Sequence, residues 1–317
     1  MRRRSLFVVL AVLLTITLVP GVASAENGEG LPIYLSLGTS LSAGTLADVD
    51  GISQPFTNKS FTDRLYPRLR NYFGGQLEHV KLGCPGETSN SMMTGMFVLG
   101  ADDPPDGDAF MDAPTPSVCS DNGPFPIYGS GTQLGDALAT LDSGTVELVT
   151  IDMGANDALR TLNGCGVNPD CISTGLGFSL VNLQSILFDI RVVHEYSGPI
   201  IGMTYYNPNL AAIVNPDVNT SGLPPDVFAA LTNQLTADYN DGLEAVYNAF
   251  GVTVADVEIA FDTQNFGDSD GNAVPDNVDM ICALTDMCPS KPGASPNIHP
   301  NPKGYLFMSR VFLAALG

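Results

Sequence analysis

Short apolar segments alternate with helical patterns along this chain, and the alternation restricts its fold more than any other feature of the sequence. The apolar segments are bounded by Gly or Pro, as strands buried in a parallel sheet are. Between them, apolar residues recur three or four positions apart, which is the spacing of one helix face. The strand segments are 31–37, 77–82, 146–153, 199–206 and 252–257, and the helical patterns are 61–73, 176–196, 226–250 and 303–316. This order predicts an α/β fold with an open, mainly parallel central sheet and helices on both faces.

Small and polar residues follow the predicted strands, at the sheet edge where ligands bind in open parallel sheets. The segments are Gly38-Thr39-Ser40-Leu41, Gly83-Cys84-Pro85-Gly86 and Gly154-Ala155-Asn156-Asp157 after the first three strands, and Asn297-Ile298-His299-Pro300 before the last helix. Serine, glycine, asparagine and histidine in this order resemble the four sequence blocks of the SGNH hydrolases, also called the GDSL esterase and lipase family. The resemblance extends from the first strand to the final helix, and it implies a three-layer α/β/α, flavodoxin-like fold.

These blocks contain the groups that acyl transfer needs. A serine hydroxyl is inert until a neutral imidazole accepts its proton, so Ser40 is the predicted nucleophile and His299 its base. Ser42 is a competing nucleophile, but the alignment of the blocks favours Ser40. The resemblance implies that the backbone N–H groups of Ser40 and Gly86 and the side-chain amide of Asn156 stabilise the oxyanion. We therefore expect a covalent acyl-enzyme that requires no organic cofactor.

Two positions depart from the family pattern. Thr39 stands where the first block usually has Asp, and Pro296 stands three residues before His299, where the last block usually has Asp. Without a carboxylate there, we expect the imidazole to donate its Nδ1–H to the backbone carbonyl of Ser295 or Pro296. The prediction is thus a Ser-His dyad.

The first residues have the pattern of a secretory signal peptide. Three arginines precede an apolar run from Leu6 to about Val19, and small residues end at Ala25. We expect residues 1–25 to be removed and residues 26–317 to form one secreted hydrolase domain, as a monomer. No second apolar segment approaches membrane length, so no integral membrane segment is expected in 26–317. The 34 acids against 13 bases, without a Lys or Arg cluster after residue 4, argue against nucleic acid and anionic membranes as partners.

Cysteine usage agrees with export. All six cysteines lie after the predicted signal peptide: Cys84, Cys119, Cys165, Cys171, Cys282 and Cys288. Two pairs lie six residues apart in turn-rich sequence, which predicts disulfides 165–171 and 282–288 and leaves 84 with 119. Other pairings are formally open, and proximity along the chain favours this one. The sequence has no C-x2-C pattern, so a metal role for these cysteines is weakly supported.

An acidic segment near the C-terminus carries oxygen-bearing side chains at positions 1, 3, 5, 9 and 12 of a loop, the spacing of EF-hand-like calcium sites. These residues are Asp268, Asp270, Asn272, Asp276 and Asp279. Ala273 stands at position 6, where an EF-hand needs Gly, and the last position has Asp instead of Glu. Two interpretations are open: a structural calcium ion near the catalytic loop, and a solvated acidic loop.

Insertions are predicted near 100–135 and 262–298. The first stretch is rich in Asp, Pro and Gly and has no period. Such loops often form substrate walls. The predicted protein is a secreted serine esterase or lipase that hydrolyses carboxylic esters. A short-chain acyl ester, a lipid ester and a carbohydrate O-acetyl group each fit the sequence. The alternative is an exported, catalytically silent binding or adhesion protein on the same fold, suggested by Thr39, Pro296 and the acidic loop.

Overall fold

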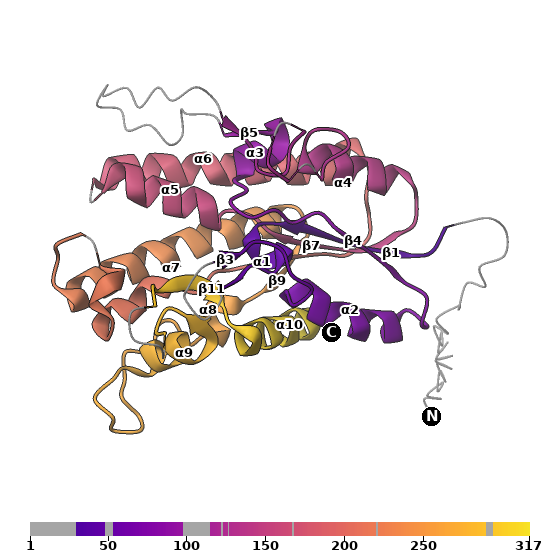
Figure 1. The fold of residues 1–317 in the computed structure, drawn as a ribbon. Helices are drawn as coiled ribbons and strands as arrows, with labels where there is room; N and C mark the ends of the chain where they lie inside the picture. Colours follow the sequence, from indigo (N-terminus) through magenta and orange to yellow (C-terminus); the bar gives the residue numbers. More distant parts are fainter. Residues whose placement is uncertain are drawn as a thin grey trace, which may run out of the picture. The chain divides into compact units, whose positions relative to one another are not determined.

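The five predicted strands form one parallel sheet in the computed structural model of the protein (Figure 1). They are β1 (Ile33–Gly38), β4 (Glu78–Lys81), β7 (Val146–Asp152), β8 (Ile200–Met203) and β9 (Thr253–Ala255). Their spatial order is β4-β1-β7-β8-β9, and every neighbouring pair is parallel. Counted along the chain, this is the order 2-1-3-4-5 of flavodoxin-like folds, so the predicted fold class is confirmed.

The structure describes residues 30–47, 53–97, 115–121, 123–125, 127–166, 168–219, 221–289 and 294–317. The predicted signal peptide and residues 100–114 of the first predicted insertion lie outside these ranges. One compact unit comprises Leu31–Gly317, and the description below concerns this unit.

Strand β1 lies between β4 and β7, and its sequence is apolar on both faces for that reason. All of its residues are buried. Leu35 pairs with Val80 of β4 on one side and with Val149 of β7 on the other. A strand buried on both faces needs helices above and below it.

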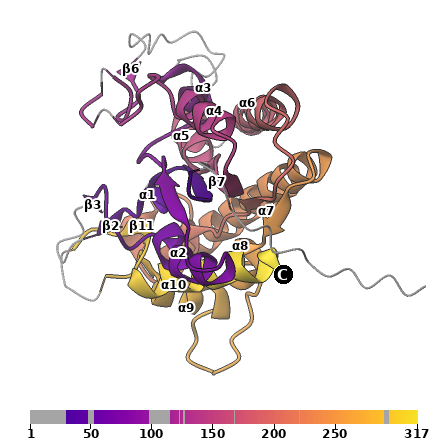
Figure 2. The ribbon, with the colours of Figure 1, turned by 90° about the vertical axis from the view of Figure 1, so that its right-hand side faces the viewer.

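Helices cover both faces of the sheet (Figures 1 and 2). On one face, α2 (Phe61–Tyr72) packs against α10 (Pro302–Leu316), and the rings of Phe61 and Phe312 stack with centroids 4.4 Å apart. The other face carries α4 (Gln133–Asp142), α5 (Ala155–Cys165), α6 (Pro169–Phe188) and α7 (Pro225–Ala249). The layers are those of the expected α/β/α arrangement.

Shorter elements connect these layers. They are α1 (Ser40–Ala43), β2 (Leu46–Ala47), β3 (Ser53–Gln54), α3 (Ser89–Thr94), β5 (Met96–Phe97), β6 (Thr115–Pro116), the π-helix η1 (Asp189–Val193), the 3-10 helices η2 (Pro208–Ile213) and η3 (Pro216–Val218), α8 (Val257–Ala260), α9 (Asp276–Leu284), β10 (Thr285–Asp286) and β11 (Asn297–Pro300).

The four helical patterns are present as α2, α6 with η1, α7 and α10, whereas α4 and α5 were not predicted. Helix α4 begins inside the stretch that was interpreted as an aperiodic insertion, and Gly135 lies in its first turn. Its buried residues Leu134, Ala137 and Leu141 have helical spacing, but the helix is only 10 residues long. Tertiary packing stabilises helices this short, so the sequence pattern alone is weak.

Three disulfides join the cysteines in the predicted pairs. The Cα atoms of Cys84 and Cys119 are 6.2 Å apart, and those of the two local pairs 165–171 and 282–288 are 5.5 and 5.0 Å apart. The first disulfide joins the turn after β4 to the segment that leads into α4, 35 residues further along the chain. It therefore links two segments that are distant in sequence at the edge of the sheet.

One described helix, Pro169–Val193, is long and apolar enough to cross a membrane by length and composition. The expectation that no further apolar segment reaches membrane length is therefore wrong for this segment. Leu183, Ile186, Leu187 and Ile190 on its inner face are buried in the core. A core helix of a folded domain passes the same test of length and composition.

Candidate active site

Four segments bring the predicted catalytic residues to one edge of the sheet. Ser40 begins α1 directly after β1, Asn156 lies in the first turn of α5 after β7, and His299 lies in β11. These three residues line one pocket. Gly86 lies in the turn after β4. The residue that follows it, Glu87, contacts Asn156, because Asn156 Nδ2 donates to the Glu87 carbonyl at 2.9 Å.

The backbone places Ser40 at the first position of a short helix. Thr39 is the N-cap, and its hydroxyl accepts from Leu41 N–H at 3.4 Å. First-turn N–H groups have no acceptor within their own helix, which makes the Ser40 N–H available to a ligand. Ser40 lines the pocket, whereas Ser42 is fully buried and donates its hydroxyl to the Thr39 carbonyl at 3.1 Å. Access to the pocket therefore distinguishes the two serines in favour of Ser40.

A buried carboxylate lies beside the nucleophile turn although residue 39 is threonine. Asp152, at the end of β7, accepts hydrogen bonds from the Thr39 N–H at 3.1 Å and from the Thr39 hydroxyl at 2.7 Å. A Cβ on Gly38 would overlap the Asp152 side chain, and the φ of Gly38 is +133°, so this position requires glycine. Burial raises the pKa of Asp152 to about 7. The neighbouring strand thus supplies a carboxylate that position 39 lacks.

Two turns present the predicted oxyanion donors. Gly86 has a φ of +78°, which favours glycine, and no atom lies within 4 Å of the place where its Cβ would be. Asn156 uses one amide hydrogen for the Glu87 carbonyl, which fixes the plane of the amide. Its second N–H is a donor for the pocket that Asn156 lines.

The group that orients His299 is the side chain of Asn297. Asn297 Oδ1 lies 2.6 Å from Nδ1 of His299 and also accepts the His299 backbone N–H at 3.1 Å. Asn297 Nδ2 donates to Ser53 Oγ at 2.9 Å, which sets the orientation of the amide. The predicted backbone acceptor at Ser295 or Pro296 is therefore wrong. The physical reason is that β11 is extended, so an amide two residues before the imidazole lies on the same side of the strand.

This arrangement selects one tautomer of His299. Because the amide oxygen of Asn297 can only accept, Nδ1 carries the proton and Nε2 has the lone pair. Burial disfavours the imidazolium and lowers the pKa of His299 to about 4. The imidazole is therefore neutral at neutral pH, as a general base must be. Among the described residues, neither Nε2 of His299 nor Oγ of Ser40 has a hydrogen-bond partner.

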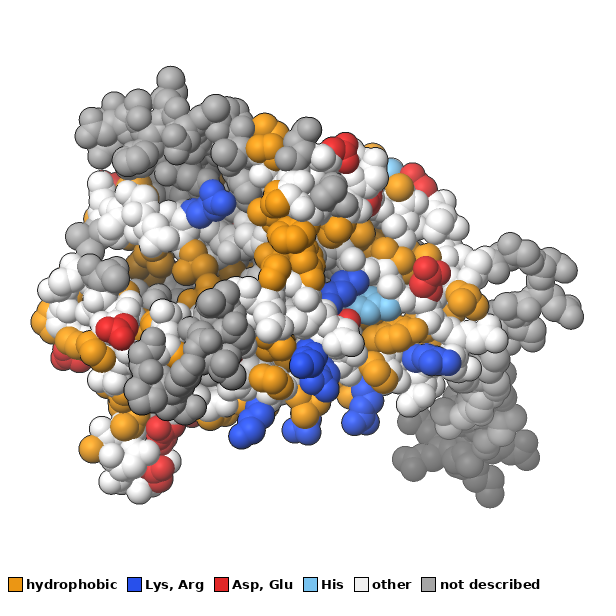
Figure 3. Space-filling model, in the orientation of Figure 1, with side chains coloured by type: hydrophobic (Ala, Val, Ile, Leu, Met, Phe, Trp, Pro, Cys, Tyr) orange, Lys and Arg blue, Asp and Glu red, His pale blue; other side chains and the backbone are white. Residues whose placement is uncertain are grey.

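The pocket beside these groups is apolar. It contains about 810 Å³ of space, its open mouth included, and it lies between α5, α6 and α7. Figure 3 shows a hollow with hydrophobic atoms in its depth on this side of the molecule. The walls include four half-buried leucines from three helices: Leu159, Leu162, Leu176 and Leu235. None of the described residues that line the pocket is charged, although the chain has 34 acids.

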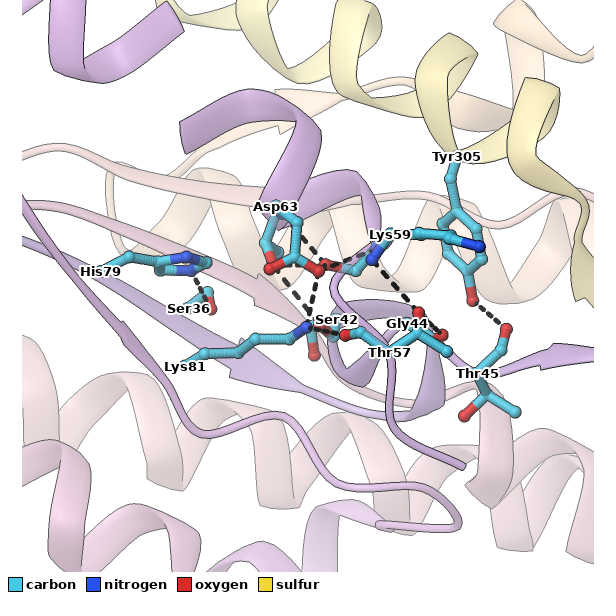
Figure 4. Close-up of polar contacts among 12 residues, drawn as sticks. Ser36, Ser42, Gly44, Thr45, Thr57, Lys59, Asp63, His79, Lys81 and Tyr305 are labelled. Carbon is cyan, nitrogen blue, oxygen red and sulfur yellow. Dashed lines mark hydrogen bonds and ion pairs between the residues drawn. The ribbon is translucent and has the colours of Figure 1, made fainter. Parts of the chain in front are cut away.

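The other two histidines lie elsewhere. His79 Nε2 is 2.9 Å from Ser36 Oγ (Figure 4). The His79 ring also stacks on Tyr34, with centroids 4.6 Å apart. His194 Nδ1 is 2.7 Å from Asp142 Oδ1 near the surface. Neither histidine lines the pocket. Both positions are consistent with structural roles.

A half-buried ion pair lies near His79 (Figure 4). Lys81 Nζ donates to Asp63 at 2.7 Å and to the Thr57 carbonyl at 2.9 Å, and Asp63 also accepts from Ser60. Tyr305 of α10 donates to the Thr45 carbonyl at 2.6 Å, next to α1. These contacts attach α2 and α10 to the segment that follows the nucleophile turn.

The predicted calcium ligands do not converge. Asp268 accepts backbone N–H groups of its own loop, Asp276 accepts from Ser269, and Asp279 accepts from Asn272 Nδ2 at 2.8 Å. Asp270 likewise accepts from Asn272 within the loop. Within the described ranges, no group of three His, Cys, Asp or Glu side chains is placed to hold a metal ion. Calcium binding stays a prediction, and no catalytic step depends on it.

Comparisons with known proteins test the family that the four sequence blocks suggest. The sequence profile of the GDSL-like lipase/acylhydrolase family matches residues 36–306. A search of curated proteins found no match to the sequence.

Solved structures that are similar to this chain include an esterase and a lipase. A catalytic mutant of an acetylxylan esterase from Geobacillus stearothermophilus is 13% identical, with a TM-score of 0.51 over 92% of this chain and 97% of that one. A second catalytic mutant of that esterase is 14% identical, with the same TM-score and coverage. An extracellular lipase from Streptomyces rimosus is 16% identical, with a TM-score of 0.47 over 90% of this chain and 99% of that one.

Proposed function

The chain belongs to the GDSL-like lipase/acylhydrolase family of carboxylic ester hydrolases, and we propose that it is a secreted serine esterase whose nucleophile is Ser40. The observation that carries this proposal is that one pocket gathers Ser40, Asn156 and His299 from three separate segments. A hydroxyl, a neutral imidazole and an amide donor in one apolar pocket are the parts that acyl transfer requires.

The reaction proceeds through an acyl-enzyme. Ser40 Oγ attacks the carbonyl carbon of the ester while its proton passes to Nε2 of His299. The carbonyl oxygen becomes an oxyanion, which the N–H groups of Ser40 and Gly86 and the Asn156 amide stabilise. When the intermediate collapses, the bond to the alcohol breaks and His299 returns the proton to the leaving oxygen. Water then attacks the acyl group with His299 again as base, and the acid is released.

Asn297 is the third member of this site, after the nucleophile Ser40 and the base His299. Its amide oxygen holds the Nδ1–H of His299, so that Nε2 faces the pocket. The constellation is therefore Ser-His-Asn. A neutral amide orients the ring but adds no charge to stabilise the imidazolium, in contrast to a carboxylate.

We further propose that the acyl group of the substrate is apolar and longer than acetyl. The leaving oxygen must lie within reach of His299, so the acyl group extends toward the walls formed by α5 and α6. Leu162 and Leu176 line this part of the pocket and are half-buried without a ligand. An acyl chain would bury their exposed surface, and each methylene so buried is worth about 0.8 kcal/mol. The absence of charge among the described lining residues supports the same substrate class.

Export is part of the proposal. Three disulfides support it, because such bonds persist in oxidising compartments outside the cytoplasm. The predicted signal peptide gives the same location.

The test is hydrolysis of p-nitrophenyl acetate, butyrate, octanoate and palmitate by the purified protein and by Ser40→Ala and His299→Ala. We expect both substitutions to abolish turnover. For the wild type, kcat/KM is expected to rise about fourfold per methylene from acetate to octanoate. Leu162→Trp should lower kcat/KM for octanoate at least about tenfold and leave acetate within about threefold. Leu231→Trp, at an exposed position of α7, is the matched control and should change neither.

The outcomes separate the parts of the proposal. Turnover that survives Ser40→Ala contradicts the nucleophile. If the wild type prefers the acetate ester, the proposed acyl group is contradicted, but the proposed nucleophile is not. Labelling of Ser40 by a fluorophosphonate distinguishes the enzyme from a silent binding protein, whose serine would not react.

A further inference from the structure

One buried carboxylate has no part in the proposed reaction, yet it lies next to the oxyanion donors. Glu87 follows Gly86, and its side chain is fully buried. Ser91 Oγ donates to Oε1 at 2.5 Å, and Ser117 Oγ and Tyr128 OH donate to Oε2 at 2.9 Å each. Burial raises the pKa of the Glu87 carboxyl, and the hydroxyl donors oppose that effect. Three hydroxyl groups from separate segments thus compensate the burial of one carboxylate.

The backbone of Glu87 contacts the site directly. Its carbonyl accepts from Asn156 Nδ2 at 2.9 Å. The N–H of Gly86, one residue earlier in the chain, belongs to the same turn. A second contact reinforces this link, because Asp157 accepts from the N–H and the hydroxyl of Ser89 at 2.9 and 2.6 Å. The turn after β4 and the first turn of α5 are therefore joined twice. Glu87 is therefore hydrogen-bonded to one of the three predicted oxyanion donors, Asn156, and adjacent in sequence to another, Gly86.

The same network reaches the nucleophile. Tyr128 OH, which donates to Glu87, accepts from Gln133 Nε2 at 2.8 Å. Gln133 holds Gly38 from both sides: its Oε1 accepts the Gly38 N–H at 2.6 Å, and its Nε2 donates to the Gly38 carbonyl at 3.0 Å. Gly38 is two residues before Ser40. A chain of buried hydrogen bonds therefore joins the nucleophile turn to the oxyanion turn.

We propose that Glu87 is a positioning residue, which holds the Gly86 and Asn156 donors in register with Ser40 through this network. The inference rests on the proposed function, because it assumes that these donors meet an oxyanion. Oxyanion donors act because they are in place before the charge develops. A small displacement of a donor therefore lowers turnover more than it weakens substrate binding. Glu87 touches no reacting atom and acts through its neighbours.

The test is Glu87→Gln, which keeps the shape of the side chain but turns one acceptor oxygen into a donor. At least one of the three hydroxyl groups then faces an N–H group and can no longer donate its own proton to the side chain at position 87. We measure kcat and KM for p-nitrophenyl butyrate, with the concentration of active sites titrated by a fluorophosphonate. We expect kcat per titrated site to fall about tenfold while KM changes less than about twofold. In the Asn156→Ala background the same change should cost about threefold or less, because one of the positioned donors is already gone.

A control and a second variant complete the experiment. Asp63→Asn alters a half-buried carboxylate that is hydrogen-bonded to Ser60 and Lys81 instead, so kcat per titrated site should not change. If Glu87→Gln does not fold, Tyr128→Phe removes the hydroxyl between Glu87 and Gln133, and kcat should fall about threefold at constant KM. An unchanged kcat in the folded variant, or an equal loss in both backgrounds, overturns the positioning role. A wild type that neither titrates nor turns over contradicts the proposed function instead.

Discussion

The described part of the chain contains two serine–histidine pairs, of which one lines a pocket and the other does not. Ser36 and His79 are hydrogen-bonded at 2.9 Å, but the pair lies near Lys81 and Asp63 (Figure 4), and neither residue lines the pocket. Ser40 and His299 have no hydrogen bond to each other within the described chain, yet both line the pocket. Catalytic hydrogen bonds often tighten only in the complex with substrate, so a shared pocket matters more here than a direct contact.

The difference shows which features identify a catalytic serine. Ser36 is fully buried, and neither member of the Ser36–His79 pair lines the pocket. At the second pair, Asn297 holds the far nitrogen of the imidazole and Asn156 supplies a donor in the pocket. Access, a fixed tautomer and preorganised donors therefore matter more than the length of one hydrogen bond.

The largest expected effect separates the two serines directly. Ser40→Ala should lower kcat/KM for p-nitrophenyl butyrate at least about 10⁴-fold, because it removes the nucleophile. Ser36→Ala should leave kcat/KM within about twofold and lower the stability by about 1–2 kcal/mol, because His79 loses its partner. Steady-state kinetics and thermal denaturation of both variants check this. Equal losses of activity would remove the distinction between the two pairs.

The next effect concerns the donor that only the catalytic pair has. Asn156→Ala should lower kcat about 10²- to 10³-fold with a small change in KM, because one oxyanion donor is lost. Asn209→Ala, at another amide that lines the pocket, is the control and should change kcat less than about threefold. A large rise in KM at constant kcat for Asn156→Ala would instead indicate a role in binding the ground state.

A third prediction uses the partner of His299. The base must be neutral, so activity is lost as the pH falls through its pKa, which burial lowers to about 4. A carboxylate at Asn297 would stabilise the imidazolium, so Asn297→Asp should move the acid limb of kcat/KM upward by about 1–2 pH units. Asn168→Asp, an N-cap that tolerates Asp, adds the same charge elsewhere and should leave the profile in place. A shift downward would contradict the assigned contact.

The smallest effect concerns stability and the structural histidine. Burial lowers the pKa of His79 to about 4, below its usual value of about 6.5 in an unfolded chain. Between these pH values the unfolded state binds more protons, so stability falls as the pH is lowered from 6.5 to 4. The double variant Ser36→Ala/His79→Phe should lose about 1–2 kcal/mol less stability than the wild type between pH 7 and pH 4.5. The acid limb of its pH–activity profile should be unchanged. Denaturant titrations at pH 7 and pH 4.5 measure the difference.

Several parts of the site could be predicted because they depend on local sequence. The turns at Ser40, Gly86 and Asn156 each follow a buried strand, and parallel strands end at one edge of the sheet. The two local disulfides could be paired because their cysteines are six residues apart in turns. The role of Asn297 was missed, although it stands two residues before His299. Whether a side chain or a backbone carbonyl reaches the imidazole depends on the conformation of β11 and on the contact with Ser53.

The sequence by itself determined the order of the five sheet strands and of four helices, and the family pattern, because periodicity and turn residues act over short stretches of chain. Only the tertiary structure decided which groups complete the site. Asp152 contacts Thr39 across 113 residues, and Tyr128 contacts Glu87 across 41. The walls of the pocket come from three helices, of which α5 was not foreseen. Burial and hydrogen bonding between such distant residues arise only when the chain is packed, and local sequence does not encode them.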